Sequence, residues 1–196
     1  MANFNKKISE TAIRVGEVRF GYVNVFAPRA NNEGNDPKYS VQLLIPKTDT
    51  VAKKLIDDAI RAAAQNGASK FRNGKVPANL KTPLRDGDEE FPDDETYAGM
   101  WFMNCSSKAD NKPGVAVLEA GQVNEALDND DFYSGCYGCA SINFFAYNAS
   151  GNQGVGAGLN NVIKTRDGER LSGGHSAEED FADLVSELGN AASFLK

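Results

Sequence analysis

Only one segment of this chain has the periodicity of an α-helix, and this feature constrains the fold more than any other. The helical segment runs from about residue 48 to residue 66. The other patterned segments are short, rich in β-branched and aromatic residues, and bounded by Gly, Asn, Asp or Ser, which is typical of β-strands. They cover residues 11–27, 38–45, 97–105, 115–118, 136–147 and 158–165. This pattern predicts a mainly β protein, a small five-stranded Greek-key barrel with one inserted helix and long loops.

The first two strands are expected to form a hairpin. Alternation in the first strand places Val18, Phe20 and Tyr22 on the same face. In the second strand, residues 38–45, the odd positions are all apolar. The residues between the strands, 28–37, are rich in Asn, Gly and Pro, which predicts a loop.

The helix has recognisable ends and one apolar face. Thr48 or Asp49 is the expected N-cap, and the helix is expected to stop at Gly67. Lysines and aspartates four residues apart fall on the opposite side, as expected for a helix with one solvated face. The apolar stripe consists of Val51, Leu55, Ile56, Ala59, Ile60 and Ala63.

Two segments of unusual composition are expected to be loops. Residues 86–95 contain seven acidic side chains in ten positions, and Phe91 stands where a calcium-binding loop requires glycine. Residues 151–158 contain four glycines but lack the Lys-Ser/Thr of a phosphate-binding loop, and no helix follows them. We interpret the first as a solvated loop and the second as a mobile connection between strands.

The cysteines do not suggest a catalytic or metal site. Cys136 and Cys139 form a C-x-x-C motif, but it leads into a strand, where positions three apart point to opposite faces. A zinc site would need Cys105 and the only histidine, His175, which lies in an expected tail. We therefore expect buried thiols and no catalytic residue, metal or cofactor.

The charge is unevenly distributed along the chain. The formal net charge is −6, but residues 1–85 carry +8 and residues 86–196 carry −14. This asymmetry indicates a basic binding surface joined to acidic segments with another role. The sequence shows neither a secretory signal nor an apolar run long enough to cross a membrane, and the odd number of cysteines fits a reducing compartment. We expect a cytoplasmic protein without a membrane partner.

Basic and aromatic residues are interleaved in the basic part of the chain. Single-stranded nucleic acid needs both types, because cations neutralise phosphates and ring faces stack on unpaired bases. The alternative is that the aromatic side chains belong to the core and the cations to a solvated face. The candidate contacts are Arg14, Arg19, Tyr22, Arg29, Lys38, Tyr39, Lys47, Lys70, Phe71, Arg72, Lys75 and Trp101.

Seven short segments, in order along the chain, resemble a family of bacteriophage single-stranded-DNA-binding proteins. They are VRFGYVNVFAP (18–28), KYSVQLLIPK (38–47), PLRDGD (83–88), FYSGC (132–136), NFFAY (143–147), GLNNV (158–162) and DGE (167–169). The resemblance implies an OB-fold and sequence-tolerant binding of single-stranded DNA during phage DNA replication or recombination, in the cytoplasm of an infected bacterium.

The resemblance also suggests a role for the end of the chain. Proteins of this family often end in an acidic tail that contacts replication partners and competes with DNA. We expect residues 1–175 to form the DNA-binding domain and residues 176–196 to form an acidic tail or short helix that contacts replication or recombination proteins. Unlike such tails, this chain continues to a basic end, SFLK (193–196). The expected partner contacts are Glu178, Glu179, Asp180, Phe181 and Asp183.

Two other functions remain open at this point. The chain could be an acidic interaction or structural module of a phage replisome or particle that binds no DNA. The acidic residues 86–95 could also hold a metal for nuclease activity, although a solvated loop is the usual meaning of such a run.

Overall fold

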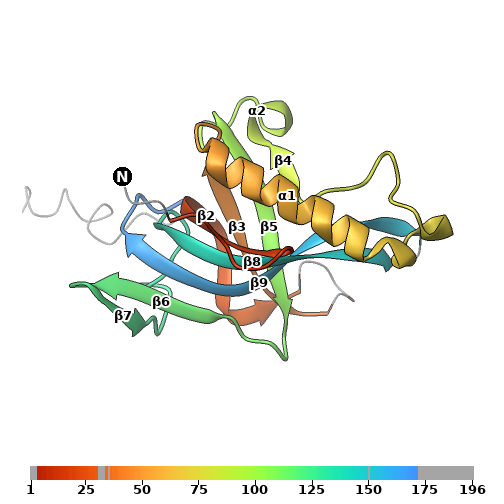
Figure 1. The fold of residues 1–196 in the computed structure, drawn as a ribbon. Helices are drawn as coiled ribbons and strands as arrows, with labels where there is room; N and C mark the ends of the chain where they lie inside the picture. Colours follow the sequence, from red (N-terminus) through yellow and green to blue (C-terminus); the bar gives the residue numbers. More distant parts are fainter. Residues whose placement is uncertain (1–3, 31–33, 35, 150, 172–196) are drawn as a thin grey trace, which may run out of the picture.

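The alternating segments of the sequence form strands that pair around a barrel, with one long helix packed on it (Figure 1). The computed structural model describes residues 4–30, 34, 36–149 and 151–171. The strands are β1 (Lys6–Lys7), β2 (Ala12–Arg29), β3 (Lys38–Pro46), β4 (Leu84–Asp86), β5 (Met100–Lys108), β6 (Gly114–Glu119), β7 (Gln122–Glu125), β8 (Tyr137–Ala149) and β9 (Asn152–Arg166). The helices are α1 (Thr50–Asn66) and α2 (Gly87–Glu90), with 3₁₀ turns η1 (Ala68–Lys70) and η2 (Arg72–Gly74).

Five strands close the barrel in the order β2, β3, β5, β9, β8. β2 pairs antiparallel with β3 and β8, β3 with β5, and β8 with β9. A parallel contact between β5 and β9, at Ser106 and Gly158, closes the ring. This arrangement confirms the predicted mainly β, OB-fold-like barrel.

The barrel interior forms the main core, and a smaller cluster lies on the other face of β3 and β5. Leu43 and Met103 point into the main core, whereas the residues next to them, Leu44 and Phe102, pack with Tyr97 in the second cluster. All five are buried. Each such side chain stabilises the fold by about 1.5–3 kcal/mol, so both faces of this part of the sheet are held in place.

Helix α1 has the expected ends. The Asp49 carboxylate accepts a hydrogen bond from the Ala52 backbone N–H at 2.8 Å, and the helix stops at Gly67. Gly67 does not adopt a positive φ; it allows close approach, because a Cβ there would lie 2.3 Å from Cβ of Ala146 in β8. The buried face is Ala52, Ile56, Ala59, Ile60, Ala63 and Ala64.

The glycine-rich segment 151–158 is not the expected loop, and this prediction was wrong. From Asn152 onward these residues belong to β9 and pair with β8. The glycines leave room for β8 side chains to lie across β9. A Cβ on Gly156 would meet the Phe145 ring at 2.9 Å, and one on Gly158 would meet the Asn143 amide oxygen at 2.6 Å. The pairing partner, and not the glycine content, determines the conformation here.

The acidic segment 86–95 is more ordered than predicted. It begins at the end of β4 and contains α2. The Lys47 ammonium forms ion pairs with both Asp86 and Asp88, and Asp86 also caps α2 through the Asp88 backbone N–H. Phe91 packs against Tyr97, with 4.4 Å between ring centroids. The carboxylates therefore have structural partners, which the composition of the segment did not indicate.

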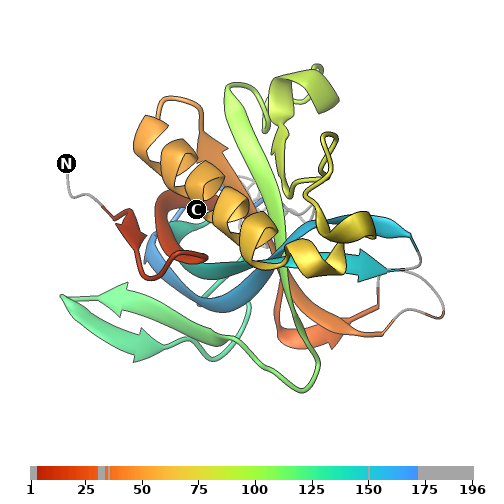
Figure 2. The ribbon, with the colours of Figure 1, turned by 45° about the vertical axis from the view of Figure 1, so that its right-hand side comes forward.

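Strands β6 and β7 form a hairpin arm beside the barrel (Figure 2). The arm is attached through the parallel pairing of β6 with β9. Strand β7 was not predicted, because all four of its residues are exposed and only one is apolar. No helix among the described residues is long and apolar enough to cross a membrane.

Candidate nucleic-acid interface

Three cations from neighbouring strands lie in a row on the outer face of the barrel. Strand pairing places Arg29 of β2 beside Lys38 of β3, and Lys38 beside Lys108 of β5. All three side chains are exposed. Within the described part of the chain, none of their charged groups forms an ion pair or hydrogen bond. Adjacent strands are about 4.8 Å apart, so this basic row is a compact unneutralised patch.

Neutral polar residues follow the basic row along the same face. The next row is Asn24, Ser40 and Ser106, in the same strand order. Ser40 and Ser106 are half-buried, and Ser106 lies beside the glycine strip of β9. Hydroxyl and amide groups both donate and accept hydrogen bonds, so this row can form hydrogen bonds with any base and selects no particular one.

The third row along this face contains Gln42 of β3 and Asn104 of β5, and a hydrogen-bond chain that starts at Tyr97 fixes it. The Tyr97 hydroxyl donates to Gln42 Oε1 at 2.9 Å, and Gln42 Nε2 donates to Asn104 Oδ1 at 3.2 Å. Burial raises the pKa of the Tyr97 phenol, so the hydroxyl keeps the proton that it donates. Asn104 is exposed, and because its oxygen accepts from Gln42, its NH₂ group is the part of the amide that remains as a donor.

The Tyr22 ring stands at the edge of these rows because β2 contains a β-bulge. Between the pairs Gly21–Gln42 and Asn24–Ser40, two residues of β2 face a single residue of β3. Tyr22 adopts φ +46° and the residue is 70% exposed. Simple alternation placed this ring on the same face as Phe20, which is buried; the bulge turns it outward, as bulges characteristically do.

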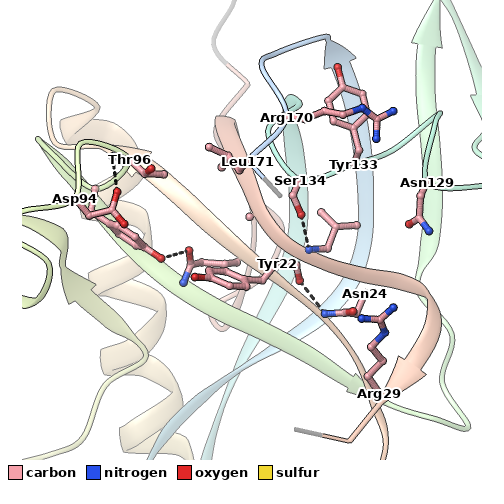
Figure 3. Close-up of a pocket in the computed structure, with 14 residues that line it drawn as sticks. Tyr22, Asn24, Arg29, Asp94, Thr96, Asn129, Tyr133, Ser134, Arg170 and Leu171 are labelled. Carbon is pink, nitrogen blue, oxygen red and sulfur yellow. Dashed lines mark hydrogen bonds between the residues drawn. The ribbon is translucent and has the colours of Figure 1, made fainter. Parts of the chain in front are cut away.

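Two hollows share Tyr22 and together form one groove over the outer face. Figure 3 shows the residues that line one of them. Their volumes are about 520 and 690 Å³. Lys38 and Arg85 line one hollow, and Arg170 lines the other. Two carboxylates, Asp36 and Asp94, also border the groove. The residues that line both hollows are Tyr22, Asn24, Arg29, Gln42 and Tyr97.

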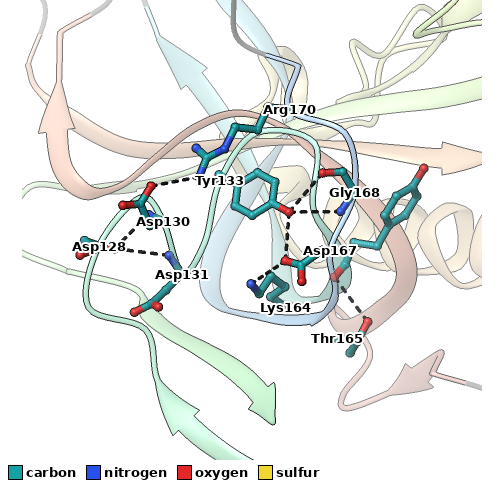
Figure 4. Close-up of polar contacts among 10 residues, drawn as sticks. Asp128, Asp130, Asp131, Tyr133, Lys164, Thr165, Asp167, Gly168 and Arg170 are labelled. Atoms are coloured by element: carbon teal, nitrogen blue, oxygen red, sulfur yellow. Dashed lines mark hydrogen bonds and ion pairs between the residues drawn. The ribbon is translucent and has the colours of Figure 1, made fainter. Parts of the chain in front are cut away.

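One wall of the groove is built on Tyr133, just before β8 (Figure 4). Its hydroxyl lies 3.0 Å from the Asp167 carboxylate and accepts a hydrogen bond from the Gly168 N–H at 3.2 Å. The Arg170 guanidinium lies 4.3 Å from the ring centroid. A hydrogen bond from Lys164 is the main cause that holds the pKa of Asp167 below its ordinary value. These contacts fix the segment that follows β9 against the groove.

Three of the predicted contacts lie together in this groove: Tyr22, Arg29 and Lys38. Two other predicted stacking residues require correction. Tyr39 is only 8% exposed and Phe71 only 3%, and both belong to the buried core. Tyr39 lies on the inner face of β3, so neither ring presents a face to a base in this structure.

Lys47 and Trp101 lie elsewhere, on the side of the barrel that α1 covers. Lys47 is neutralised by Asp86 and Asp88, whose hydrogen bonds raise its pKa. Trp101 is half-buried, with the ammonium groups of Lys47 and Lys53 4.7 and 5.0 Å from its ring centroid. The predicted pair of a phosphate contact and a stacking ring is therefore a structural cluster in this state of the protein.

Two predicted arginines on β2 are engaged with backbone carbonyl groups. Arg19 donates to the carbonyl oxygens of Gly135 and Glu169, at 3.3 and 2.9 Å. Arg14 donates to the Phe4 carbonyl at 2.8 Å. Neither lines the groove.

The remaining predicted cations gather beside the β8–β9 hairpin. Lys70 donates to the Ala146 carbonyl at 3.1 Å, whereas Arg72 and Lys75 are exposed. Phe145 of the same hairpin, which was not predicted as a contact, is 44% exposed and lies across Gly156. A glycine opposite an aromatic residue, Gly156 opposite Phe145, could have indicated this exposed ring. The pair can be recognised only once the register of β8 and β9 is known.

The groove and the basic row also contain residues whose types gave no signal. Asn104 and Ser106 are ordinary polar residues, and only their pairing with β3 places them on the face and in the hollow that Lys38 also lines. Lys108 was one basic residue among many until its register placed it in the basic row. Asn104, Ser106 and Lys108 are alternate residues of β5 and therefore share one face. Alternation in β5, combined with its alignment to β3, could have predicted all three.

The cysteines are buried, as expected. Cys105 and Cys136 have no measurable exposure and Cys139 has 4%. Burial is the main cause that raises the pKa of the Cys136 thiol to about 11, so at neutral pH it is protonated and a poor nucleophile. Among the described residues, no three His, Cys, Asp or Glu side chains are grouped to hold a metal ion. His175 and the expected partner contacts, Glu178, Glu179, Asp180, Phe181 and Asp183, lie outside the described residues.

Comparisons with known proteins extend over most of the chain. The family described as the single-stranded-DNA-binding protein of Enterobacter phage Enc34 matches residues 11–191. Protein p50 of Acyrthosiphon pisum secondary endosymbiont phage 1 is 30% identical over 178 residues, which are 88% of this chain and 93% of p50.

Solved structures show the same similarity. The single-stranded-DNA-binding protein from bacteriophage Enc34, in complex with single-stranded DNA, has a TM-score of 0.73 and 26% identity, covering 88% of this chain and 96% of that one. For gp2.5, a single-stranded-DNA-binding protein encoded by bacteriophage T7, the TM-score is 0.58 and the identity 16%, covering 89% and 94% of the two chains. The second likeness is one of fold alone.

Proposed function

This chain belongs to the family of the Enterobacter phage Enc34 single-stranded-DNA-binding protein, and we propose that it binds single-stranded DNA in the groove over β2, β3 and β5. It does so with little sequence preference, in phage DNA replication or recombination, in the cytoplasm of the infected bacterium. It acts by binding and not by catalysis.

The observation that carries the proposal is the basic row beside an exposed ring. Arg29, Lys38 and Lys108 have no acidic partner in the described part of the chain, so their charge is available to phosphates. Each phosphate contact releases a condensed counterion, which makes binding favourable at low salt and weaker as salt rises.

Stacking gives the preference for single strands. Tyr22 presents a largely exposed ring at the junction of the two hollows, and an unpaired base can lie on it. Stacking of this kind stabilises binding by about 1–3 kcal/mol per base and accepts any base. In a duplex the base faces are already stacked on one another. The exposed ring of Phe145 is a second platform beside Arg72 and Lys75 on the β8–β9 hairpin side.

The decisive experiment is a pair of titrations of the full chain, followed by fluorescence anisotropy at about 0.1 M salt. One uses labelled oligo-dT and the other a labelled duplex of equal length. We expect tighter binding of oligo-dT and a steep loss of affinity as salt is raised. Equal affinity for the two ligands, or no binding of oligo-dT, would overturn the proposal.

Two further surfaces complete the proposal. Lys70, Arg72 and Lys75 provide a further basic surface for a strand that leaves the groove. Residues 1–175 form the DNA-binding domain, and residues 176–196 contact replication or recombination proteins through an acidic segment. The proposed contacts of that segment are Glu178, Glu179, Asp180, Phe181 and Asp183.

A further inference from the structure

The β-bulge that displays Tyr22 has a specific support outside β2 and β3. Where two residues of β2 face one residue of β3, the regular ladder is interrupted between Gly21 and Asn24. The backbone N–H of Val23, inside this interruption, donates to the Ser134 hydroxyl at 3.0 Å (Figure 3). Ser134 belongs to the segment before β8, 111 positions further along the chain.

We propose that Ser134 is a positioning residue for DNA binding: its hydroxyl holds the bulge that presents the Tyr22 ring to a base. The inference rests on the proposed function. It assigns part of the affinity for single-stranded DNA to Ser134, whose hydroxyl acts by holding the bulge. Tyr22 has a positive φ, which is unfavourable for a residue with a bulky side chain. Such a conformation persists only where neighbouring contacts over-determine it.

The contacts around the bulge meet this requirement. Besides the Ser134 contact, the Asn24 amide donates to the Tyr22 carbonyl at 3.1 Å. Both bonds engage the peptide unit that follows Tyr22: Ser134 accepts from its N–H and Asn24 donates to its carbonyl oxygen. Of the two, only the Ser134 bond ties the bulge to another part of the chain.

Ser134 is itself fixed by its neighbours. The backbone N–H of Gly135 donates to the Phe20 carbonyl at 2.7 Å, and the N–H of Phe20 donates to the Cys136 carbonyl at 2.9 Å. On the other side, the Ser134 carbonyl accepts a hydrogen bond from Leu171 at 2.9 Å. The hydroxyl is therefore presented to Val23 from a segment with three backbone bonds to the rest of the barrel.

Loss of the hydroxyl removes the acceptor for the Val23 N–H. Because the Val23 N–H then has no hydrogen bond that favours the bulged geometry, the backbone at Tyr22 can relax away from the left-handed region. The ring is then free to leave the groove. Stacking weakens, whereas the three cations of the basic row, which take no part in the hydrogen bonds of the bulge, keep their phosphate contacts.

The test is a double-mutant cycle with Ser134→Ala and Tyr22→Ala, measured as the affinity of the full chain for labelled oligo-dT. We expect Ser134→Ala to weaken binding roughly 3- to 10-fold, a part of the stacking contribution of one base. In the Tyr22→Ala background the same substitution should change affinity less than about 2-fold, because the positioned ring is gone. The slope of log affinity against log salt should stay unchanged, since no phosphate contact is lost.

An isosteric pair of variants separates the hydroxyl from the shape of the side chain. Ser134→Thr keeps the hydroxyl, and we expect wild-type affinity; Ser134→Val has the shape of Thr without the hydroxyl, and we expect the Ser134→Ala affinity. Should Ser134→Ala fail to fold, this pair decides the question. Ser9→Ala is the matched control, because Ser9 also accepts backbone N–H bonds, from Ala12 at the start of β2 and from Thr11 just before it, and lines neither hollow.

The outcomes are distinct. Non-additive losses with an unchanged salt slope support the positioning role. Equal losses in both backgrounds, wild-type affinity for Ser134→Ala, or equal affinities for the Thr and Val variants would overturn it while wild-type binding stands. A wild-type chain that binds no oligo-dT would instead overturn the proposed function, and this inference with it.

Discussion

Tyr22 stands where the two hollows of the groove meet, and among the four predicted stacking residues it has by far the clearest platform. The residue is 70% exposed, while Tyr39 and Phe71 are buried and Trp101 lies under α1. The difference among these residues is one of position in the fold and not of chemistry.

Tyr22→Ala should therefore weaken binding of oligo-dT about 5- to 100-fold, the equivalent of one lost base stack of roughly 1–3 kcal/mol. Tyr22→Trp should keep most of the affinity, because it keeps a ring. Anisotropy titration at constant salt provides the measurement. Val51→Ala, an equally simple truncation of an exposed side chain on α1, should leave affinity unchanged. Wild-type affinity for Tyr22→Ala would exclude the ring as a stacking platform.

Lys38 and Lys47 show why the cations of the groove could be predicted only in part. Both are lysines at the two ends of β3, and composition does not separate them. Lys38 has no partner among the described side chains, whereas Lys47 is bound by Asp86 and Asp88, about 40 positions further along the chain. The sequence around Lys47 gives no indication of an ion pair with residues so far along the chain.

Lys47→Met should accordingly change stability and not DNA affinity. The pKa values of Asp86 and Asp88 are lowered mainly by the hydrogen bond from Lys47, so their contribution exists above the ordinary pKa of 3.8 and disappears as pH falls through the lowered values. The pKa of Lys47 is raised, so its contribution persists until the pH rises past 10.5.

We therefore expect Lys47→Met to melt below the wild type at pH 7 and the difference in melting temperature to become smaller near pH 2, where the two carboxylates are protonated. Thermal melts followed by circular dichroism provide this comparison. Affinity for oligo-dT at pH 7 should remain within about 2-fold of wild type, since no free cation is removed. A loss of affinity as large as that of Tyr22→Ala would return Lys47 to the DNA-binding set.

At the scale of elements, the strands and the helix could be predicted from the sequence wherever one face of the element is buried and the other is exposed. Alternation located β2 and β3, and the Asp49 cap with Gly67 located α1. The bulge at Tyr22 and the pairing of residues 152–158 were not predictable, because both depend on the partner strand. Local patterns report which residues are buried, but register decides where an extra residue or a glycine is needed.

Gly138 illustrates a register-dependent glycine. A Cβ there would lie 1.8 Å from the Ile163 carbonyl oxygen, a backbone atom of the neighbouring strand β9. Gly138→Ala must push the two strands apart, and we expect a loss of more than about 2 kcal/mol in the free energy of unfolding.

Chemical denaturation provides the measurement, and Gly121→Ala is the control. Gly121 has φ +80° but open space around it, so only the backbone cost of about 1 kcal/mol is expected. If Gly138→Ala were no more destabilising than Gly121→Ala, the close packing of β8 on β9 at this point would be wrong.

At the scale of the whole molecule, the net charge of −6 does not describe the surface that meets DNA. Much of the positive charge in the first 85 residues is neutralised within the fold: Lys53 and Lys54 pair with aspartates on α1, and Arg85 pairs with Glu90. Strands β2, β3 and β5 bring together the three cations of the basic row, which have no acidic partner among the residues that the structure describes. The uneven charge along the sequence predicted a basic surface; the strand order determined which cations compose it.

The most direct test of this account is the salt dependence of oligo-dT binding by the triple variant Arg29→Ala/Lys38→Ala/Lys108→Ala. Each phosphate contact contributes about 0.7 to the slope of log affinity against log salt for single strands, so the slope should become shallower by about 2. A matched triple variant on α1, Lys53→Ala/Lys54→Ala/Arg61→Ala, should retain the wild-type slope. If the basic-row variant keeps the wild-type slope and affinity, the DNA does not bind on the outer face of β2, β3 and β5.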